Sequence, residues 1–139
     1  MYSMKETCKQ VGMSYETLKF YCNEGLIPNV KRDKNNYRIF DDNNINWIKS
    51  LSCLKKCGMS LDEMRKYLNL CLQGKSSIPE RKAMLDEKKK ILELKIKEIE
   101  DSLSFIEWKQ NFYNDILDGK TEYYSYLIDV NNNKWGRKL

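Results

Sequence analysis

The strongest constraint on the fold is a seven-residue repeat of apolar side chains in the second half of the chain. The pattern predicts one long helix from about Pro79, a residue suited to the first turn of a helix, to Asp118, just before Gly119. One set of repeating positions is Leu85, Leu92, Ile99, Ile106 and Tyr113, and its companion set is Ile96, Leu103, Gln110 and Leu117. Two such sets on one helix are typical of a coiled-coil seam.

The length of this predicted helix requires something to cover the seam. At about 1.5 Å per residue the helix would extend about 60 Å, which is too far for a small helical core to cover. We therefore expect a second helix against the seam, most simply that of a second copy of the chain. In the alternative interpretation, the apolar stripe packs against the N-terminal half of its own chain.

Composition favours a soluble protein with one core and an appendage. The 139 residues suffice for one ordinary domain and an extension. With 41% apolar and 32% charged residues, the chain has no apolar run near the roughly 18 residues that span a bilayer. The start, MYSMKETCKQ, lacks the apolar stretch of a secretory signal. We therefore expect a cytoplasmic protein with no membrane segment.

The positive charge lies in the first half of the chain. Residues 1–75 hold 13 Lys or Arg against 8 Asp or Glu, whereas residues 76–139 hold 12 of each kind. A basic half suits a polyanion such as DNA, because Lys and Arg that neutralise phosphates release condensed counterions. So small an excess is also compatible with ordinary solubility, so charge alone does not decide between the two.

The first half reads as two short helices followed by a hairpin. Ser3 suits the start of a helix that stops at Gly12, and Ser14 suits the start of another that stops at Gly25, which together outline a helix-turn-helix. The segment NVKRDKNNYRIF then predicts a small hairpin with a polar tip. Asn35 and Asn36 in this tip can both adopt the positive φ that tight hairpin turns require.

Two more helices and a tail complete the predicted organisation. A third helix is expected from about Asp42 to Gly58, and a fourth from Ser60, where Ser60 and Glu63 form a capping-box pattern, to Gly74. We predict a domain at 1–75, a dimerisation helix at 78–118 and a tail at 119–139. In the tail, we expect some side chains to dock on the rest of the protein, namely those of Tyr123, Tyr124, Tyr126 and Leu127. We expect the segment Asn131–Leu139 to be mobile.

The segment TLKFYCNEGLIPNVKRDKNNYRIF, followed by LKKCGMSLDEM and the long helix, resembles the MerR family of bacterial transcription regulators over about residues 3–118. The resemblance implies a mainly α fold, in which a winged helix-turn-helix is paired through an antiparallel coiled coil. It also implies a homodimer that binds an inverted repeat in promoter DNA and distorts that DNA for RNA polymerase when an effector is sensed. The resemblance implies no cofactor.

The resemblance also assigns candidate DNA-binding residues. The start of the second helix enters the major groove in helix-turn-helix proteins, and the candidates there are Ser14, Tyr15, Glu16 and Thr17. The family's Arg-Tyr-Tyr block, which holds the DNA backbone, is matched by Lys19, Phe20 and Tyr21, with departures at the first two positions. The wing candidates are Lys31, Arg32, Lys34, Asn35, Tyr37 and Arg38, and Asn36 replaces a usual glycine. Tyr21 is equally compatible with a place in the core, and the wing cations with a solvated loop.

The cysteines bear on what such a regulator would sense. Five cysteines, an odd and scattered set, suit free thiols in a reducing compartment: Cys8, Cys22, Cys53, Cys57 and Cys71. The chain has no histidine and no cysteine after Cys71, so we expect no metal site. The stretch NWIKSLSCLKKCGMSL, followed by QGKSSIPERKAMLDEKKK, resembles the aldehyde-responsive subgroup of the family, and this resemblance places Cys53 at the position of the sensing cysteine.

Two interpretations of Cys53 remain open at this stage. Lys49, Lys55 and Lys56 are near it in sequence and can favour its reactive thiolate form, which suits a sensor. Alternatively, it is a small buried apolar residue, as free cysteines often are. The other four cysteines are expected to be structural.

Three other functions are alternatives to that of a sensing regulator. An enzyme is disfavoured because the chain has no histidine, no glycine-rich loop and no paired-cysteine motif. A regulator of the same type that senses a small organic ligand fits the same pattern. A pure coiled-coil adaptor would explain the second half of the chain but not the cationic wing.

Overall fold

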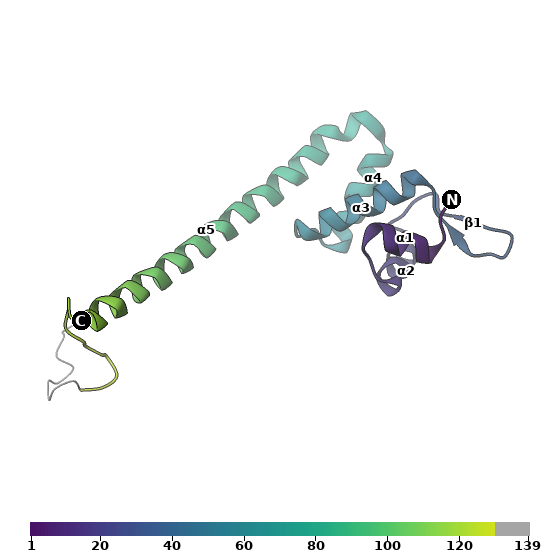
Figure 1. Cartoon of the computed structure of the whole chain (residues 1–139). Coiled ribbons are helices and arrows are strands. Elements are labelled where there is room, and N and C mark those ends of the chain that lie inside the picture. The colour runs from purple at the N-terminus through teal and green to yellow at the C-terminus, as the bar shows by residue number, and fades with distance from the viewer. Residues whose placement is uncertain (130–139) are drawn as a thin grey trace. The chain divides into compact units, whose positions relative to one another are not determined.

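We describe the fold from a computed structural model of the chain, which describes residues 1–129 (Figure 1). The predicted mobile segment Asn131–Leu139 lies outside the described residues. The chain divides into two compact units, Met1–Leu92 and Glu93–Leu139. The elements in order are α1 Met4–Val11, α2 Tyr15–Asn23, β1 Lys31–Arg32, β2 Arg38–Ile39, α3 Asp42–Lys56, α4 Leu61–Leu72, the 3₁₀ turn η1 Gly74–Ser77 and α5 Ile78–Leu117. Within the described part of the chain, no helix is long and apolar enough to cross a membrane.

Local side-chain caps fix where α1 and α2 begin. The Ser3 hydroxyl accepts a hydrogen bond from the backbone N–H of Glu6, whose carboxylate accepts one from the Ser3 N–H, which is a complete capping box. The hydroxyl of Ser14 caps α2 by accepting from the Thr17 N–H at 3.1 Å. Gly12, at φ 66°, ends α1 in the left-handed conformation that glycine adopts without strain. The helix-turn-helix predicted from these residues is therefore present.

The wing is the antiparallel hairpin of β1 and β2, which projects from the helices of the first unit (Figure 1). Its tip depends on Asp33, whose carboxylate accepts hydrogen bonds from the N–H groups of Asn35 and Tyr37 at 2.8 and 3.0 Å. In the tip only Asn36, at φ 66°, adopts the positive φ that was expected of both asparagines. Asn35 stays at negative φ because the Asp33 carboxylate holds its N–H, so the turn needs one left-handed residue instead of two.

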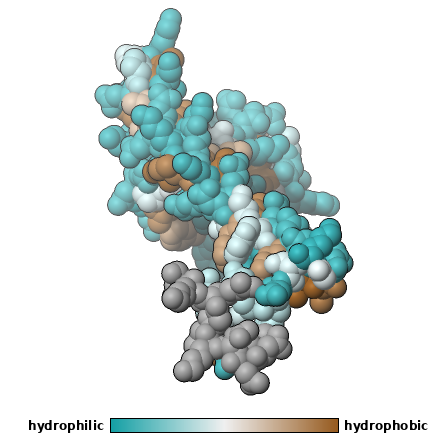
Figure 2. Space-filling model, turned by 90° about the vertical axis from the view of Figure 1, so that its left-hand side faces the viewer, coloured by the Kyte–Doolittle hydropathy of each residue, from teal (hydrophilic) through white to brown (hydrophobic). Residues whose placement is uncertain are grey.

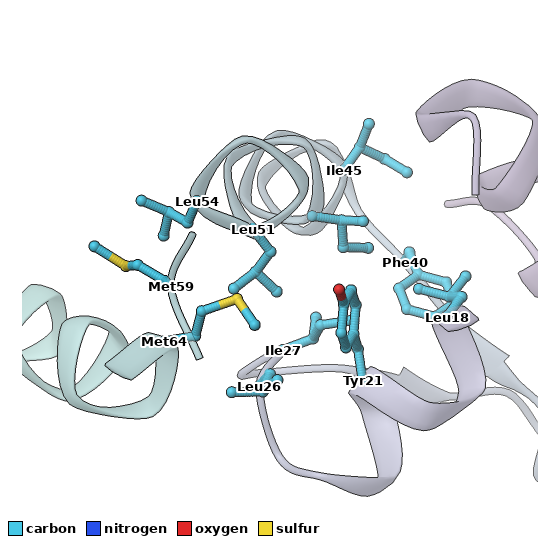
Figure 3. Close-up of a cluster of buried hydrophobic side chains, with 11 residues drawn as sticks. Leu18, Tyr21, Leu26, Ile27, Phe40, Ile45, Leu51, Leu54, Met59 and Met64 are labelled. Atoms are coloured by element: carbon cyan, nitrogen blue, oxygen red, sulfur yellow. The ribbon is translucent and has the colours of Figure 1, made fainter. Parts of the chain in front are cut away.

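The core of the first unit joins α2, the wing and α3. Its fully buried side chains include Leu18 of α2, Phe40 after β2 and Leu51 of α3, each 0% exposed (Figure 3). Phe40 is also fixed through its backbone, because it exchanges two hydrogen bonds with Tyr2 at 2.7 and 2.8 Å. The N-terminal residues thereby close the edge of the wing next to the core.

Helix α4 is linked to the start of α5 by charged side chains within the first unit. The Lys88 ammonium lies 2.7 Å from a carboxylate oxygen of Glu63, and this hydrogen bond holds the pKa of Glu63 below its usual value. The Arg81 guanidinium donates to the Gly74 carbonyl at 2.6 Å and to the Ser77 hydroxyl at 3.0 Å. These contacts order the turn η1, which was not predicted from the sequence.

Helix α5 has 40 residues, and none of them is buried. It begins at Ile78, one residue before the predicted Pro79. The seam residues are exposed in the single chain, apart from the half-buried Leu92. Within the second unit, for example, Ile96 and Leu117 are 55% and 83% exposed. Exposed hydrophobic side chains are visible among hydrophilic ones in Figure 2.

Part of the tail docks as expected. The Tyr124 ring meets the Phe112 ring of α5 edge-on, with centroids 5.2 Å apart, and contacts Tyr126 at 5.7 Å. In contrast, the side chain of Leu127 is 86% exposed. The first tail residues therefore form a small aromatic cluster with the end of α5.

Candidate nucleic-acid interface

The first turns of α2 present a mixed polar and aromatic surface. Tyr15, Glu16 and Lys19 are exposed, as a surface that meets DNA requires. Ser14 and Thr17 are engaged with each other, because the Ser14 hydroxyl also donates to the Thr17 hydroxyl at 2.8 Å. Their side chains are therefore committed to starting the helix, which leaves the other three as the freer candidates for contact with bases.

Two neighbouring aromatic residues of α2 have different environments. Phe20 is 44% exposed, so its ring lies at the surface. Tyr21 is 2% exposed, and its side chain points from α2 into the hydrophobic cluster (Figure 3). Of the two interpretations left open by the sequence, the structure supports packing for Tyr21, because its side chain is enclosed by Ile27, Phe40 and their neighbours. We therefore remove Tyr21 from the DNA contacts.

The wing carries the densest group of exposed cations in the first unit, at Lys31, Arg32 and Lys34. Arg32 donates to the Asn36 carbonyl at 2.8 Å, which orders its guanidinium across the hairpin. The half-buried Arg38 donates to the side-chain oxygen of Asn23 at 2.7 Å. This last bond joins the wing to the end of α2, so the two surfaces that would meet DNA are held together.

Three residues that the sequence analysis did not single out support this arrangement. Asn23 orients Arg38, as described above. The Trp47 indole N–H donates to the Leu26 carbonyl at 2.8 Å, and the Asn44 amide donates to the Pro28 carbonyl at 3.1 Å. Both bonds anchor the segment between α2 and the wing to α3. No local sequence pattern identifies these partners, because they lie 15 to 21 residues apart.

Charges behind the wing affect the nearby cysteines. Burial raises the pKa of the Cys22 thiol, although Arg38 and Arg32 act in the opposite direction by favouring the thiolate. Burial also raises the pKa of Cys8. The environments of Cys8 and Cys22 fit the structural roles expected of them.

A separate contact links two helices of the first unit. At the end of α2, Glu24 forms an ion pair with Arg65 of α4.

Cys53 lies on the surface of α3, so the alternative of a buried apolar cysteine is wrong for this structure. Lys49 is four residues before it and Lys56 three residues after it, so both lie on the same face of the helix. Lys55, two residues away, does not share that face. Among residues 1–129, no three His, Cys, Asp or Glu side chains are grouped so as to hold a metal ion.

The paired helices, the cationic hairpin and the supporting helices α3 and α4 make a winged helix-turn-helix, which defines a class of DNA-binding proteins. Residues 2–71 match the family described as MerR HTH family regulatory protein, and residues 46–107 match the family described as MerR, DNA binding. The chain belongs to the MerR family and is a DNA-binding transcriptional regulator. Proteins of this family are regulators, which agrees with the prediction that the chain is not an enzyme.

Similar proteins cover most of the chain. An uncharacterized HTH-type transcriptional regulator of Haemophilus influenzae is 35% identical over 81% of this chain and 83% of its own length. The HTH-type transcriptional regulator AdhR of Bacillus subtilis is 33% identical over 60% of this chain and 59% of its own length. The crystal structure of HiNmlR, a MerR family regulator lacking the sensor domain, bound to promoter DNA, matches with a TM-score of 0.71 and 33% identity. That match covers 84% of this chain and 89% of the other.

Proposed function

We propose that the chain acts in the cytoplasm as a homodimer that binds an inverted repeat in promoter DNA. The observation that carries this proposal is the Arg38–Asn23 hydrogen bond, which holds a cationic wing beside the exposed start of α2. In this arrangement Tyr15, Glu16 and Lys19 face the bases and backbone of one half-site. The wing cations neutralise the flanking phosphates. HiNmlR, a similar protein, was crystallised on promoter DNA, which supports this mode of binding.

The seam of α5 supports the homodimer. Ile99, Leu103 and Ile106 are 60%, 53% and 49% exposed in the single chain, which is costly for apolar side chains in water. A second copy running antiparallel would cover them and would place two identical wings on two half-sites. We propose 1–75 as the DNA-binding domain and 78–118 as the dimerisation helix of this assembly.

The wing makes a direct prediction for DNA binding. Replacing Arg38 with Ala should weaken binding to the inverted repeat upstream of the gene by about tenfold, because an ordered phosphate contact is lost. The slope of log affinity against log salt should become shallower by about one per lost contact and per half-site. Fluorescence anisotropy on labelled duplex at several salt concentrations measures both quantities.

A charge-matched control separates a wing contact from a general loss of charge. Lys66 is exposed on α4, so Lys66→Ala removes one cation outside the wing. We expect its salt slope to equal that of the wild type. Equal slopes for all three proteins would remove Arg38 from the interface.

We further propose that Cys53 senses electrophiles such as aldehydes. Its exposed sulfur lies on a helix face shared with Lys49 and Lys56. In this reaction the Cys53 sulfur adds to the carbonyl carbon, a C–S bond forms, and the carbonyl oxygen takes up the proton that the thiol gives up. The product is a neutral thiohemiacetal, so the reaction needs no oxidant and reverses when the aldehyde is removed. The modified dimer would then distort the promoter so that RNA polymerase can use it.

Transcription in vitro tests the sensor. We expect a small aldehyde to change transcription from the protein's own promoter with the wild-type protein, and to have no effect with Cys53→Ser, although both bind the operator equally. Cys57→Ser, at the residue that caps the end of α3, should respond like the wild type. A response that persists in Cys53→Ser would contradict the assignment and would favour a regulator of a small organic ligand.

A further inference from the structure

The end of α5 and the tail residues beside it enclose a small pocket that the DNA-binding surface does not use. Its volume is about 220 Å³. It is lined by Trp108, Lys109, Phe112 and Tyr113 of α5 and by residues 123–127, so it lies within the second compact unit.

The walls of the pocket are mostly aromatic. Trp108 and Phe112 are stacked, with centroids 6.0 Å apart and planes 9° from parallel. Tyr124 closes on Phe112 edge-on at 5.2 Å, and Tyr126 follows at 5.7 Å from Tyr124. Ring faces and edges arranged in this way suit a flat apolar molecule, which gains from stacking as well as from burial.

One cation lies among these rings. The half-buried Lys109 ammonium is 5.5 Å from the Trp108 centroid, 6.0 Å from that of Phe112 and 5.6 Å from that of Tyr113. None of the ion pairs found among residues 1–129 involves Lys109. Because the rings already face a positive charge, the pocket disfavours a cationic ligand and offers an anionic one a charged partner.

The Trp108 and Phe112 side of the pocket lies away from the predicted dimer seam. At about 100° per residue, Trp108 is roughly opposite the centre of the seam formed by Ile106, Gln110 and Leu117 around the helix. Phe112 lies on the same far side, whereas Tyr113 belongs to the seam itself and Lys109 lies beside the seam. A dimer joined through the seam would cover the Tyr113 side of the pocket and leave the Trp108 and Phe112 side open.

We propose that this pocket binds a small aromatic carboxylate, with its ring against Trp108 and Phe112 and its carboxylate against Lys109. An apolar cavity of about 150 Å³ holds benzene, so a pocket of about 220 Å³ has room for one or two fused rings. The site is independent of Cys53 and of DNA. Binding is therefore measured on the free protein, and its failure would leave the proposed DNA-binding function untouched.

Isothermal titration of the full chain with 2-naphthoate tests the site. The neutral isostere 2-naphthamide and the cationic 2-naphthylmethylammonium serve as comparison ligands. We expect one naphthoate per chain, bound about tenfold more tightly than the amide, because a charge-assisted hydrogen bond replaces a neutral one. The cation should bind more weakly than either.

Two variants locate the bound molecule. Lys109→Met keeps most of the length of the side chain but removes its charge, so the acid and the amide should bind with equal affinity. Phe112→Ala removes one aromatic wall, so both ligands should bind more weakly. Lys97→Met, which changes an exposed lysine of the same helix outside the pocket, should behave like the wild type. Helix content measured by circular dichroism accompanies each titration.

Each other outcome would overturn the proposal. Equal affinity of the wild type for acid and amide, or tighter binding of the cation, would show that Lys109 does not select an anion. A preference for the acid that persists in Lys109→Met would place the carboxylate elsewhere. Unchanged binding by a folded Phe112→Ala would place the ring elsewhere, and absence of binding at millimolar naphthoate would remove the site.

Discussion

Ile99→Glu is expected to convert the protein into a monomer and to lower its affinity for the inverted repeat by at least about 100-fold. The substitution places a carboxylate in the middle of the seam, where an antiparallel partner would bury two such charges without a counterion. Linking two half-site contacts in one dimer raises overall affinity by about 10² to 10⁴, and this gain is lost when the chains separate. Analytical ultracentrifugation and anisotropy on the duplex measure the two effects.

Ser104→Glu is the matched control for the seam. It introduces the same residue and the same change in charge on α5, but its position lies well away from the seam around the helix and is exposed. We expect this variant to remain a dimer and to bind DNA like the wild type. If Ile99→Glu also remained a dimer with unchanged affinity, the chains would have to associate through another surface.

Phe40→Ala is expected to lower the free energy of unfolding of the first unit by about 3 to 5 kcal/mol, the usual cost of removing a buried aromatic ring. Phe40 is 0% exposed and packs in the cluster shared by α2 and α3. Natural domains have only about 5 to 15 kcal/mol of stability, so the variant should lose DNA binding near physiological temperature. Urea titration followed by the fluorescence of Trp47, with Trp108 and Trp135 changed to Phe, measures the loss.

Tyr37→Ala provides the comparison, because this wing aromatic is 70% exposed. We expect its free energy of unfolding to change by no more than about 0.5 kcal/mol. Equal losses for the two variants would mean that Phe40 does not anchor the core.

Helix ends were predictable from the sequence because they depend on local contacts. The Ser3 and Ser60 caps each use a partner three residues away, and the structure confirms both. Gly12 ends α1 as predicted. The wing was also predictable, because its apolar and polar residues lie on either side of a short polar tip. The family and the fold class, a winged helix-turn-helix with a long C-terminal helix, were predicted from the resemblance of the segment TLKFYCNEGLIPNVKRDKNNYRIF and the elements after it to the MerR family.

The candidate interface was predictable only in part. The sequence identified the exposed cations of the wing and the start of α2, and their contacts with DNA stay predictions. It could not decide between core and contact for Tyr21, because both uses place an aromatic residue at the same helical position. It could not decide the exposure of Cys53 either, since small thiols are common inside and outside cores. Asn23 was missed because its partner, Arg38, is 15 residues away.

The sequence by itself determined the helices, the hairpin and the repeat on α5, because each arises from residues within a few positions of one another. Only the tertiary structure decided which side chains are buried and which are held by distant partners. Tyr21 became a core residue when Phe40 and α3 packed over it. The pocket beside Lys109 formed when the tail residues 123–127 came to lie beside the end of α5. Burial and long-range hydrogen bonds depend on how elements pack, and no local pattern of residue types specifies that packing.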